Sequence, residues 1–375
     1  MKGKPRVLMI TQEVNPRSPT LGFVWGWIVE LAKKFDRLYV ATSKVENVME
    51  KPANVEFYEW KTRGDGGGQW RKPALRYEGA IYSLKRLASY AKIAIKLSSL
   101  IIDLKAKGMI DAVFAHMNPE YVLAVAPVCK PLRIPIITWY LHKHVSLRLK
   151  LAHALSEKVL TAHEHGCRIR SSKVIVTGHG IPIPKAPQLV HDKQNVIISV
   201  GRVSKIKRYE DAIRALSRVR RARKDVRLKI VGPIYDFEYQ RALLKIAREE
   251  GVDDALTFTG PVPHVEMGKI YDEAALLVSC CPALDKVVLE AMAHGVPVVV
   301  ADPMFDELLK NHTAYCRYRS GNPTDLASKI LTLLENEGLR AEVGRDLRRA
   351  VIEKHSLERL ISKIFDVIWE AVRKY

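Results

Sequence analysis

Residues 276–301 read LLVSCCPALDKVVLEAMAHGVPVVVA, and this stretch decides the fold. The apolar runs 276–280 and 297–301 have the length and composition of buried strands. The segment between them has a helical pattern that ends at Gly295, because glycine readily takes the left-handed conformation that follows many helices, and Pro297 cannot continue a helix. A strand, a helix and a strand in this order predict a βαβ unit with parallel strands buried on both faces.

The same alternation extends over most of the chain. Strands are predicted at 7–11, 38–42, 112–116, 134–141, 158–162, 173–177, 196–200, 228–231 and 256–259. Helices are predicted at 26–35, 80–105, 209–221, 236–250, 325–334 and 356–372. Near-continuous Val and Ile runs that alternate with helices indicate an α/β protein built on parallel sheets.

The chain is long enough for two domains, since its 375 residues exceed the ~250–300 at which single cores stop growing. The segment 181–187 reads IPIPKAP, and three prolines so close together fit neither a helix interior nor a central strand. We therefore predict one doubly wound domain over 1–184 and a second over 190–355. The amphipathic helix within 356–375 completes the chain.

Composition narrows the setting. Hydrophobic residues make up 47% of the chain, which argues against disorder. The start of the sequence lacks the apolar core of a signal peptide, and no apolar run reaches the ~18 residues of a membrane span, so a cytoplasmic protein is expected. The five cysteines form neither a CxxC pair nor a zinc-binding spacing. The formal charge of +20 suggests an anionic partner, with nucleic acid, an anionic membrane and phosphorylated substrates all left open.

A first candidate binding motif is Ser199–Lys207, SVGRVSKIK. A predicted strand ends at Gly201, where a ligand can approach the backbone, and the cations Arg202 and Lys207 follow. Ligands of open α/β sheets bind beyond the carboxyl ends of the strands, so both cations would lie where a diphosphate needs neutralising. The alternative is that both are solvated loop residues.

A second candidate is the loop and helix that follow the strand at 276–280. The amides at a helix N-terminus attract phosphate. Glu290 lies one turn inside this helix among apolar neighbours. Although it could be a surface charge, a carboxylate in such surroundings needs a polar partner, and ribose hydroxyls would serve.

Together these segments resemble the family 4 (GT-B, retaining) glycosyltransferases. The resemblance rests on GR-x4-K at 201–207, EDAIRA at 210–215, LKIVG at 228–232, FTGPV at 258–262 and LEAMAHGVPVV at 289–299. It implies two Rossmann-like domains facing a cleft, with a nucleoside-diphosphate sugar bound by the second domain and the acceptor by the first. It also implies retention of the anomeric configuration and a last helix that crosses back to the first domain.

The resemblance assigns roles to individual residues. It implies donor binding by Gly201, Arg202, Lys207, Val262, Leu284, Asp285, Lys286, Val287 and Glu290, with catalytic roles for His142, Arg202, Lys207 and Glu290. In this assignment Arg202 and Lys207 neutralise the diphosphate, and Glu290 binds the ribose. Val262 offers its backbone to the base, and His142, after the strand at 134–141, faces the donor sugar. Gly22 and Phe23 belong to the acceptor-side loop.

The sequence departs from the family at one place. The family has a Glu-x7-Glu pair, and Pro282 stands where its first glutamate, which holds the donor sugar, would fall. Asp285 or the backbone amides of 284–286 could replace it. Two alternatives therefore stay open, a catalytically impaired sugar-nucleotide-binding subunit and an epimerase of the same fold. Because the sequence has no Asp-x-Asp motif, we expect neither a metal nor another cofactor.

The acceptor is the least defined part. The segment Lys61–Lys107 holds eleven Lys and Arg against three acidic residues and includes several aromatics. Such a surface could dock on anionic lipid at the inner face of the membrane, which would favour a lipid-linked acceptor or a polysaccharide precursor. The alternative is a solvated basic helix face. A nucleic-acid partner is not expected, because no recognition helix or aromatic binding sheet is evident.

Overall fold

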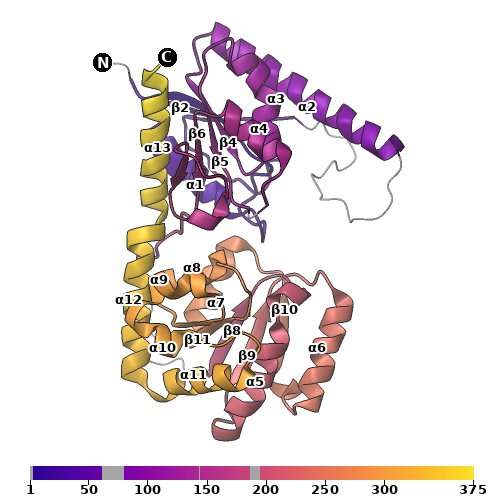
Figure 1. Cartoon of the computed structure of the whole chain (residues 1–375), viewed down its shortest axis with the longest axis vertical. Coiled ribbons are helices and arrows are strands. Elements are labelled where there is room, and N and C mark those ends of the chain that lie inside the picture. Colours follow the sequence, from indigo (N-terminus) through magenta and orange to yellow (C-terminus); the bar gives the residue numbers. More distant parts are fainter. Residues whose placement is uncertain (1–2, 61–79, 143, 186–194) are drawn as a thin grey trace. The chain divides into compact units, whose positions relative to one another are not determined.

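The computed structural model describes residues 3–60, 80–142, 144–185 and 195–375, with the side chains of 80–87 left out of the description (Figure 1). The chain splits into two compact units. Unit 1 comprises residues 1–16, 21–180 and 358–375, and unit 2 comprises 17–20 and 181–357. Each unit is built around one parallel sheet.

In the described part of unit 1, seven strands form a parallel sheet in the order β3-β2-β1-β4-β5-β6-β7. The strands are β1 (Arg6–Ile10), β2 (Arg37–Thr42), β3 (Val55–Glu59), β4 (Ala112–His116), β5 (Ile136–Trp139), β6 (Lys158–Thr161) and β7 (Val174–Val176). The helices are α1 (Phe23–Lys34), α2 (Ala80–Ala106), α3 (Pro119–Cys129), α4 (Leu147–Leu155) and α13 (Leu357–Arg373). Every residue of β4 is buried, as expected for a strand covered on both faces.

Helix α13 completes the core of unit 1, although it lies at the far end of the sequence. Its Leu360, Ile364 and Ile368 are fully buried, and its Phe365 ring stands 5.8 Å from the ring of Phe35. The apolar residues recur every three or four positions, so they form one face of the helix. The predicted amphipathic helix thus packs by its apolar face on the unit that begins the chain (Figure 1).

The described residues of unit 2 form a five-stranded parallel sheet in the order β10-β9-β8-β11-β12. Its strands are β8 (Val196–Val200), β9 (Arg227–Val231), β10 (Leu256–Gly260), β11 (Leu276–Ser279) and β12 (Val298–Val300). Its helices are α5 (Tyr209–Ala222), α6 (Phe237–Glu249), α7 (Met267–Glu273), α8 (Lys286–Ala293), α9 (Asp306–Leu309), α10 (Thr313–Cys316), α11 (Pro323–Glu335) and α12 (Glu337–His355). The βαβ unit predicted from 276–301 is β11-α8-β12, and Gly295 has the positive φ of 74° expected after a helix.

Apart from the short excursion at residues 17–20, the chain passes between the units at 180–181 and at 357–358, which lie close together. Ile181 is fully buried and forms a β-bridge with Ser356. Its backbone amide donates to the carbonyl of His355 at 2.7 Å, and its carbonyl accepts from the amide of Leu357 at 2.8 Å. The first residue of the proline-rich segment is therefore fixed in unit 2 rather than free.

Besides helices such as α3, α4 and α7, for which no range was predicted, three elements differ instructively from the predictions. Helix α1 begins at Phe23, three residues before the predicted start at 26. Strand β3, sequence VEFYE, lies at the sheet edge, and its two glutamates hide the strand from an apolar-run criterion. Helix α12 is rich in charge and even buries Arg340, so its apolar face is weakly marked.

No helix in the described part of the chain combines the length and apolar character needed to cross a membrane. All five cysteines fall within the described residues, where each is buried and free of disulfide bonds.

Candidate functional site

The sheet of unit 2 changes winding direction between β8 and β11. From β8 the chain adds β9 and β10 on one side, then returns to add β11 and β12 on the other. Open α/β sheets bind ligands at such a point, beyond the carboxyl ends of the two strands, and this position is called the crevice below. The two candidate motifs, around Gly201 and around Lys286, follow these two strands.

Two glycines let the strand ends approach closely. Gly201 and Gly232 both have a φ of 143°, a conformation that L side chains rarely adopt. A Cβ on Gly232 would lie 2.3 Å from the carbonyl oxygen of Gly201, and a Cβ on Gly201 would lie 2.8 Å from Nζ of Lys207. The ammonium of Lys207 thus lies directly over the end of β8, where only hydrogen fits.

The Lys207 ammonium also reaches across to the loop after β11, where it forms an ion pair with Asp285. Asp285 is the residue before α8, but its side chain does not cap that helix. Both side chains are largely buried, with exposed fractions of 11% and 22%. The structure therefore brings Lys207 to the N-terminus of α8, where unpaired helix amides favour anions.

Glu290 is the anionic centre of this side of the sheet. Its carboxylate accepts a hydrogen bond from the Tyr271 hydroxyl at 2.8 Å and lies 3.4 Å from Nε2 of His264 and 3.5 Å from Nζ of Lys286. Burial alone would raise its pKa, but Lys286, His264 and Tyr271 together lower the pKa of Glu290 to about 2. Glu290 is therefore ionised at physiological pH, with polar partners supplied by the protein itself.

Burial and the contacts with Glu290 also shift the pKa values of two neighbouring residues, Lys286 and Tyr271. The Lys286 ammonium faces Glu290. Burial lowers the pKa of Lys286, and the nearby negative charge of Glu290 opposes that effect. Burial and the adjacent carboxylate of Glu290 raise the pKa of Tyr271 well above its usual value. Tyr271 and His264 were not predicted as site residues. An aromatic residue in α7 and a loop histidine carry no motif, and only the fold places them beside Glu290.

The remaining predicted donor residues are spread along the rim. The Arg202 guanidinium is exposed and stands 5.5 Å from the ring centroid of Tyr235, a cation–π contact on the β9 side of the crevice. Val262, Leu284 and Val287 are partly buried against the unit 2 core. Pro282 is exposed.

Unit 1 has its own winding change, between β1 and β4. Here the Thr11 hydroxyl and Nδ1 of His116 form a buried hydrogen bond of 3.0 Å across the two strand ends. Aromatic rings surround His116, with Trp27 at 5.1 Å, Trp139 at 5.5 Å and Phe23 at 6.0 Å. His116 was not predicted as a site residue, because a histidine that ends a strand gives no signal without the topology.

The predicted site residues of unit 1 lie in two segments, His142 after β5 and Gly22 with Phe23 at the start of α1. His142 is exposed three residues beyond β5, and its Nδ1 accepts from the amide of His144 at 3.0 Å. Gly22 immediately precedes α1 with an ordinary helical φ of −55°, so its backbone requires no glycine. Phe23 begins α1 and joins the rings around His116.

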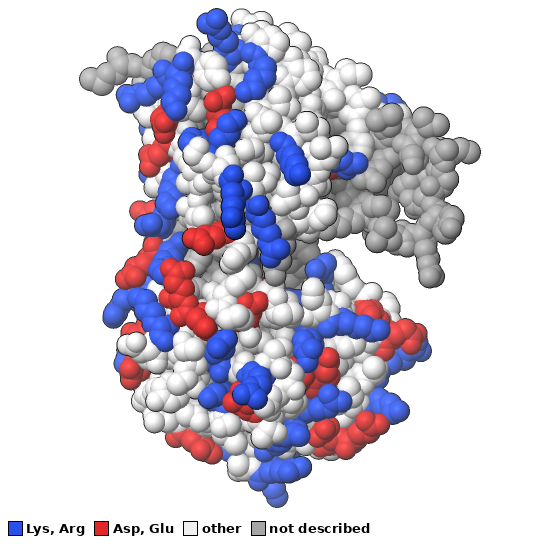
Figure 2. Space-filling view, in the orientation of Figure 1, with Lys and Arg blue, Asp and Glu red and all other residues white. Residues whose placement is uncertain are grey.

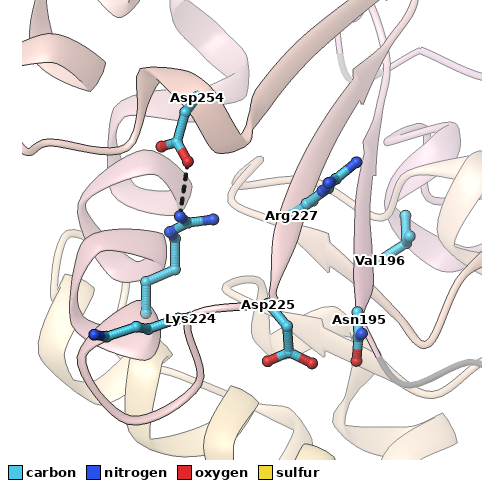
Figure 3. A pocket seen from close by; sticks show the side chains of 7 residues that line it. Asn195, Val196, Lys224, Asp225, Arg227 and Asp254 are labelled. Carbon is cyan, nitrogen blue, oxygen red and sulfur yellow. Dashed lines mark hydrogen bonds and ion pairs between the residues drawn. The ribbon is translucent and has the colours of Figure 1, made fainter.

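A hollow of about 420 Å³ lies at the opposite, amino end of β8 and β9 (Figure 3). Arg220, Lys224 and Arg227 line it together with Asp225 and Asp254. Arg220 is held by Asp254 at 2.8 Å, while Lys224 and Arg227 point in different directions. Because the cations do not converge, this hollow is not a built anion site, and the crevice between β8 and β11 remains the candidate functional site.

Comparison with known proteins bears on the same region. The family model described as glycosyl transferases group 1 matches residues 183–350, which include every predicted donor residue. The chain is 23% identical over 185 residues to N-acetyl-alpha-D-glucosaminyl L-malate synthase of Bacillus anthracis, covering 49% of this chain and 48% of that protein. It is 27% identical over 188 residues to D-inositol 3-phosphate glycosyltransferase of Nocardia farcinica, covering 47% and 41%. The chain thus spans about half the length of these two curated relatives.

Among solved structures, Anabaena HepE in complex with UDP and glucose superimposes with a TM-score of 0.71 at 17% identity. The match covers 98% of this chain and 100% of that one. At this identity the likeness shows the fold alone. It confirms the predicted α/β fold with two parallel sheets, of the GT-B type.

Proposed function

Because residues 183–350 match the family model of the group 1 glycosyl transferases, we propose that this protein transfers a glycosyl group from a nucleoside-diphosphate sugar to an acceptor. The observation that carries the proposal is the meeting of Lys207 with Asp285 at the start of α8, one helical turn from Glu290. A cation, helix amides and a fixed carboxylate at one winding change are the groups that a nucleoside diphosphate needs.

In this proposal the diphosphate displaces the Asp285 carboxylate from Lys207 and takes its place. The phosphate oxygens then accept from Lys207 and from the first amides of α8, and Arg202 swings from Tyr235 to join them. Ribose hydroxyls approach Glu290, and the base lies against the backbone at Val262. Asp285, once released, becomes available to the hydroxyls of the donor sugar, the place that Pro282 leaves without a carboxylate.

Catalysis follows from the charge that develops when the glycosidic bond breaks. The leaving diphosphate gains negative charge, and cations and amides already aimed at it stabilise the transition state more than the ground state. Lys207 already lies over the end of β8, so once its ion pair with Asp285 opens it needs no long movement to reach the diphosphate. This arrangement does the work without a metal, and retention is proposed from the family resemblance.

We assign the acceptor to unit 1, with Gly22, Phe23 and His142 on its loops. Phe23 is the partly exposed ring of the cluster around His116, whose other rings are buried, and its face suits an apolar face of a sugar. The acceptor's chemical class remains a lipid-linked molecule or a polysaccharide precursor.

Part of the proposed membrane-docking segment, residues 61–79, lies outside the described residues. In the described part of α2, the exposed Ile95 and Ile102 lie near the exposed Lys92 and Lys105. Apolar and basic residues together favour an anionic lipid surface, which would place a cytoplasmic protein on the inner face of the membrane. Figure 2 shows basic side chains interspersed with acidic ones over the visible face, without the continuous basic stripe of a nucleic-acid site.

The membrane proposal is tested by co-sedimentation with vesicles of phosphatidylglycerol and of phosphatidylcholine. Binding to the anionic vesicles alone, lost at high salt, supports it. Equal recovery in the supernatant with both lipids would remove it.

The function itself is tested by a radiolabelled screen of UDP-, GDP- and ADP-sugars, with calorimetry of each nucleotide. Turnover or donor hydrolysis supports a transferase. Tight nucleotide binding without either would favour the impaired subunit that Pro282 suggests, and interconversion of sugar epimers would favour an epimerase. Absence of affinity for every nucleotide would overturn the proposal.

A further inference from the structure

A group of potential metal ligands lies in unit 2 on elements that the proposed transferase site does not use. His312 ends a 3-10 turn at Lys310–His312, and Glu342 and Asp346 lie on α12. One ligand atom from each residue lies within 4.8 Å of the others. We infer that His312, Glu342 and Asp346 form a binding site for a divalent transition metal ion, most suitably Zn²⁺.

The backbone brings the three ligands together. Glu342 and Asp346 are four residues apart in a helix, so their side chains project from the same face. Helix α12 also packs against the short α9, which immediately precedes the turn that carries His312. The ring of His312 therefore meets two carboxylates from one helical face.

The distances suit a zinc ion after a small adjustment. Nε2 of His312 lies 3.0 Å from Oδ2 of Asp346. Ligand atoms bound at about 2.0 Å to a tetrahedral zinc ion are separated by ~3.3 Å. This pair is therefore already close to the spacing of two adjacent ligands. The Glu342 carboxylate is exposed, so it is free to move the remaining distance.

The surroundings supply further features of a metal site. His312 is buried, with 8% of its side chain exposed, which fixes the ring. The second oxygen of Asp346 lies 3.9 Å from the Arg349 guanidinium, so a cation orients this carboxylate from outside. Beside the group is a hollow of about 120 Å³, lined by His312, Asp346 and Arg349 among others, which has room for a water ligand.

The ligand types favour zinc. One imidazole and two carboxylates form a mixed nitrogen and oxygen set, whereas Mg²⁺ and Ca²⁺ prefer oxygen ligands alone. Lys310 and Arg349 line the same hollow, and their positive charge reduces the affinity below that of a closed structural site. We therefore expect reversible binding. A bound ion would join the turn at 310–312 to α12 and stabilise unit 2.

Unit 2 also contains a natural control. His294 and Asp272 form a second His–Asp pair, with Nδ1 and Oδ1 3.0 Å apart. Among the described residues, only the group around His312 gathers a third ligand. If any His–Asp pair bound zinc, substitutions at either pair would weaken zinc binding. If three ligands are needed, only substitutions in the group around His312 will weaken it.

The experiment uses the full chain without an affinity tag, stripped with EDTA and titrated with ZnCl₂ by calorimetry. We expect one saturable Zn²⁺ per chain and a rise in the thermal unfolding temperature. Each of His312→Gln, Glu342→Gln and Asp346→Asn should weaken binding roughly tenfold or more, and Asp272→Asn should leave it unchanged. Co²⁺ should give a visible absorption band in the wild type that the three variants lose.

Glu342 is exposed, so Glu342→Gln should leave the fold intact even if His312→Gln does not. A loss of zinc binding in Glu342→Gln therefore cannot be attributed to unfolding. Absence of saturable binding to the stripped wild type would overturn the site. So would binding that none of the three variants weakens, since the zinc would then lie elsewhere. None of these readouts depends on transferase activity.

Discussion

The two sheets of this protein change winding direction in the same way, yet they place opposite chemistry at that point. In unit 2 the crevice between β8 and β11 holds Lys207, Asp285 and the ionised Glu290. In unit 1 the ends of β1 and β4 are joined by a buried Thr11–His116 hydrogen bond packed among aromatic rings. One topology thus carries a charged cluster in unit 2 and a buried aromatic cluster in unit 1. The fold determines where ligands bind, and the side chains determine which ligands bind there.

The largest expected effect tests the charged crevice. Lys207→Ala should lower kcat/KM by about 100-fold or more, because the leaving diphosphate loses a preorganised cation in a partly buried place. Arg202→Ala should also cost orders of magnitude in turnover. Steady-state kinetics with the donor identified by the screen checks both. Lys205→Ala is the matched control, since this exposed lysine lies on the same turn. Near wild-type transfer by Lys207→Ala would contradict its assigned role.

The next effect concerns Glu290 and appears in stability as well as binding. Glu290→Gln leaves the half-buried Lys286 without a carboxylate, which should cost about 3 kcal/mol in the free energy of unfolding. Because the folded pKa of about 2 lies below the ordinary 4.5, this stabilisation is present above pH 4.5 and is lost as pH falls toward 2. Denaturant unfolding at several pH values should show that the difference in free energy of unfolding between wild type and Glu290→Gln becomes smaller as the pH falls from 4.5 toward 2.

A double variant separates the two roles of Glu290. Lys286→Met combined with Glu290→Gln removes both charges, so much of the lost stability should return. Nucleotide affinity should stay low if Glu290 binds ribose. If stability and nucleotide affinity both recovered in the double variant, Glu290 would affect nucleotide binding only through the stability of unit 2.

A smaller effect is expected at the winding change of unit 1. Thr11→Val removes the hydroxyl partner of the buried His116, which should cost about 1 kcal/mol in unfolding free energy. Nucleotide affinity, a property of unit 2, should not change, and calorimetry checks this. A fall in nucleotide affinity as large as that of Lys207→Ala would erase the proposed division between the two sites.

The smallest effect is expected at the acceptor-side loop. Phe23→Leu keeps an apolar side chain but loses the edge-on ring contacts to Trp27 and His116, worth about 0.5–1 kcal/mol. With donor hydrolysis in water and transfer to acceptor measured side by side, only transfer should decline. An equal decline in both would place Phe23 outside the acceptor side.

The sequence predicted the features that depend on residues close together in the chain. Continuous Val and Ile runs mark buried parallel strands, and Gly201 or Gly295 marks a backbone that needs a positive φ. What it could not foretell depends on long-range packing. Tyr271 and His264 come to Glu290 from other elements, and the Lys207–Asp285 ion pair joins residues 78 positions apart. The edge strand β3 was missed because its two glutamates interrupt the apolar run, and only its place at the sheet edge explains why they are tolerated.

The position of α13 has a consequence for how the protein is made. Unit 2 is almost continuous in sequence, whereas unit 1 needs Leu360, Ile364 and Ile368 to close its core. These residues leave the ribosome after everything that they cover. During synthesis the first unit to be started is therefore the last to be finished, and its unfinished apolar surface must be kept from aggregating until the final helix docks.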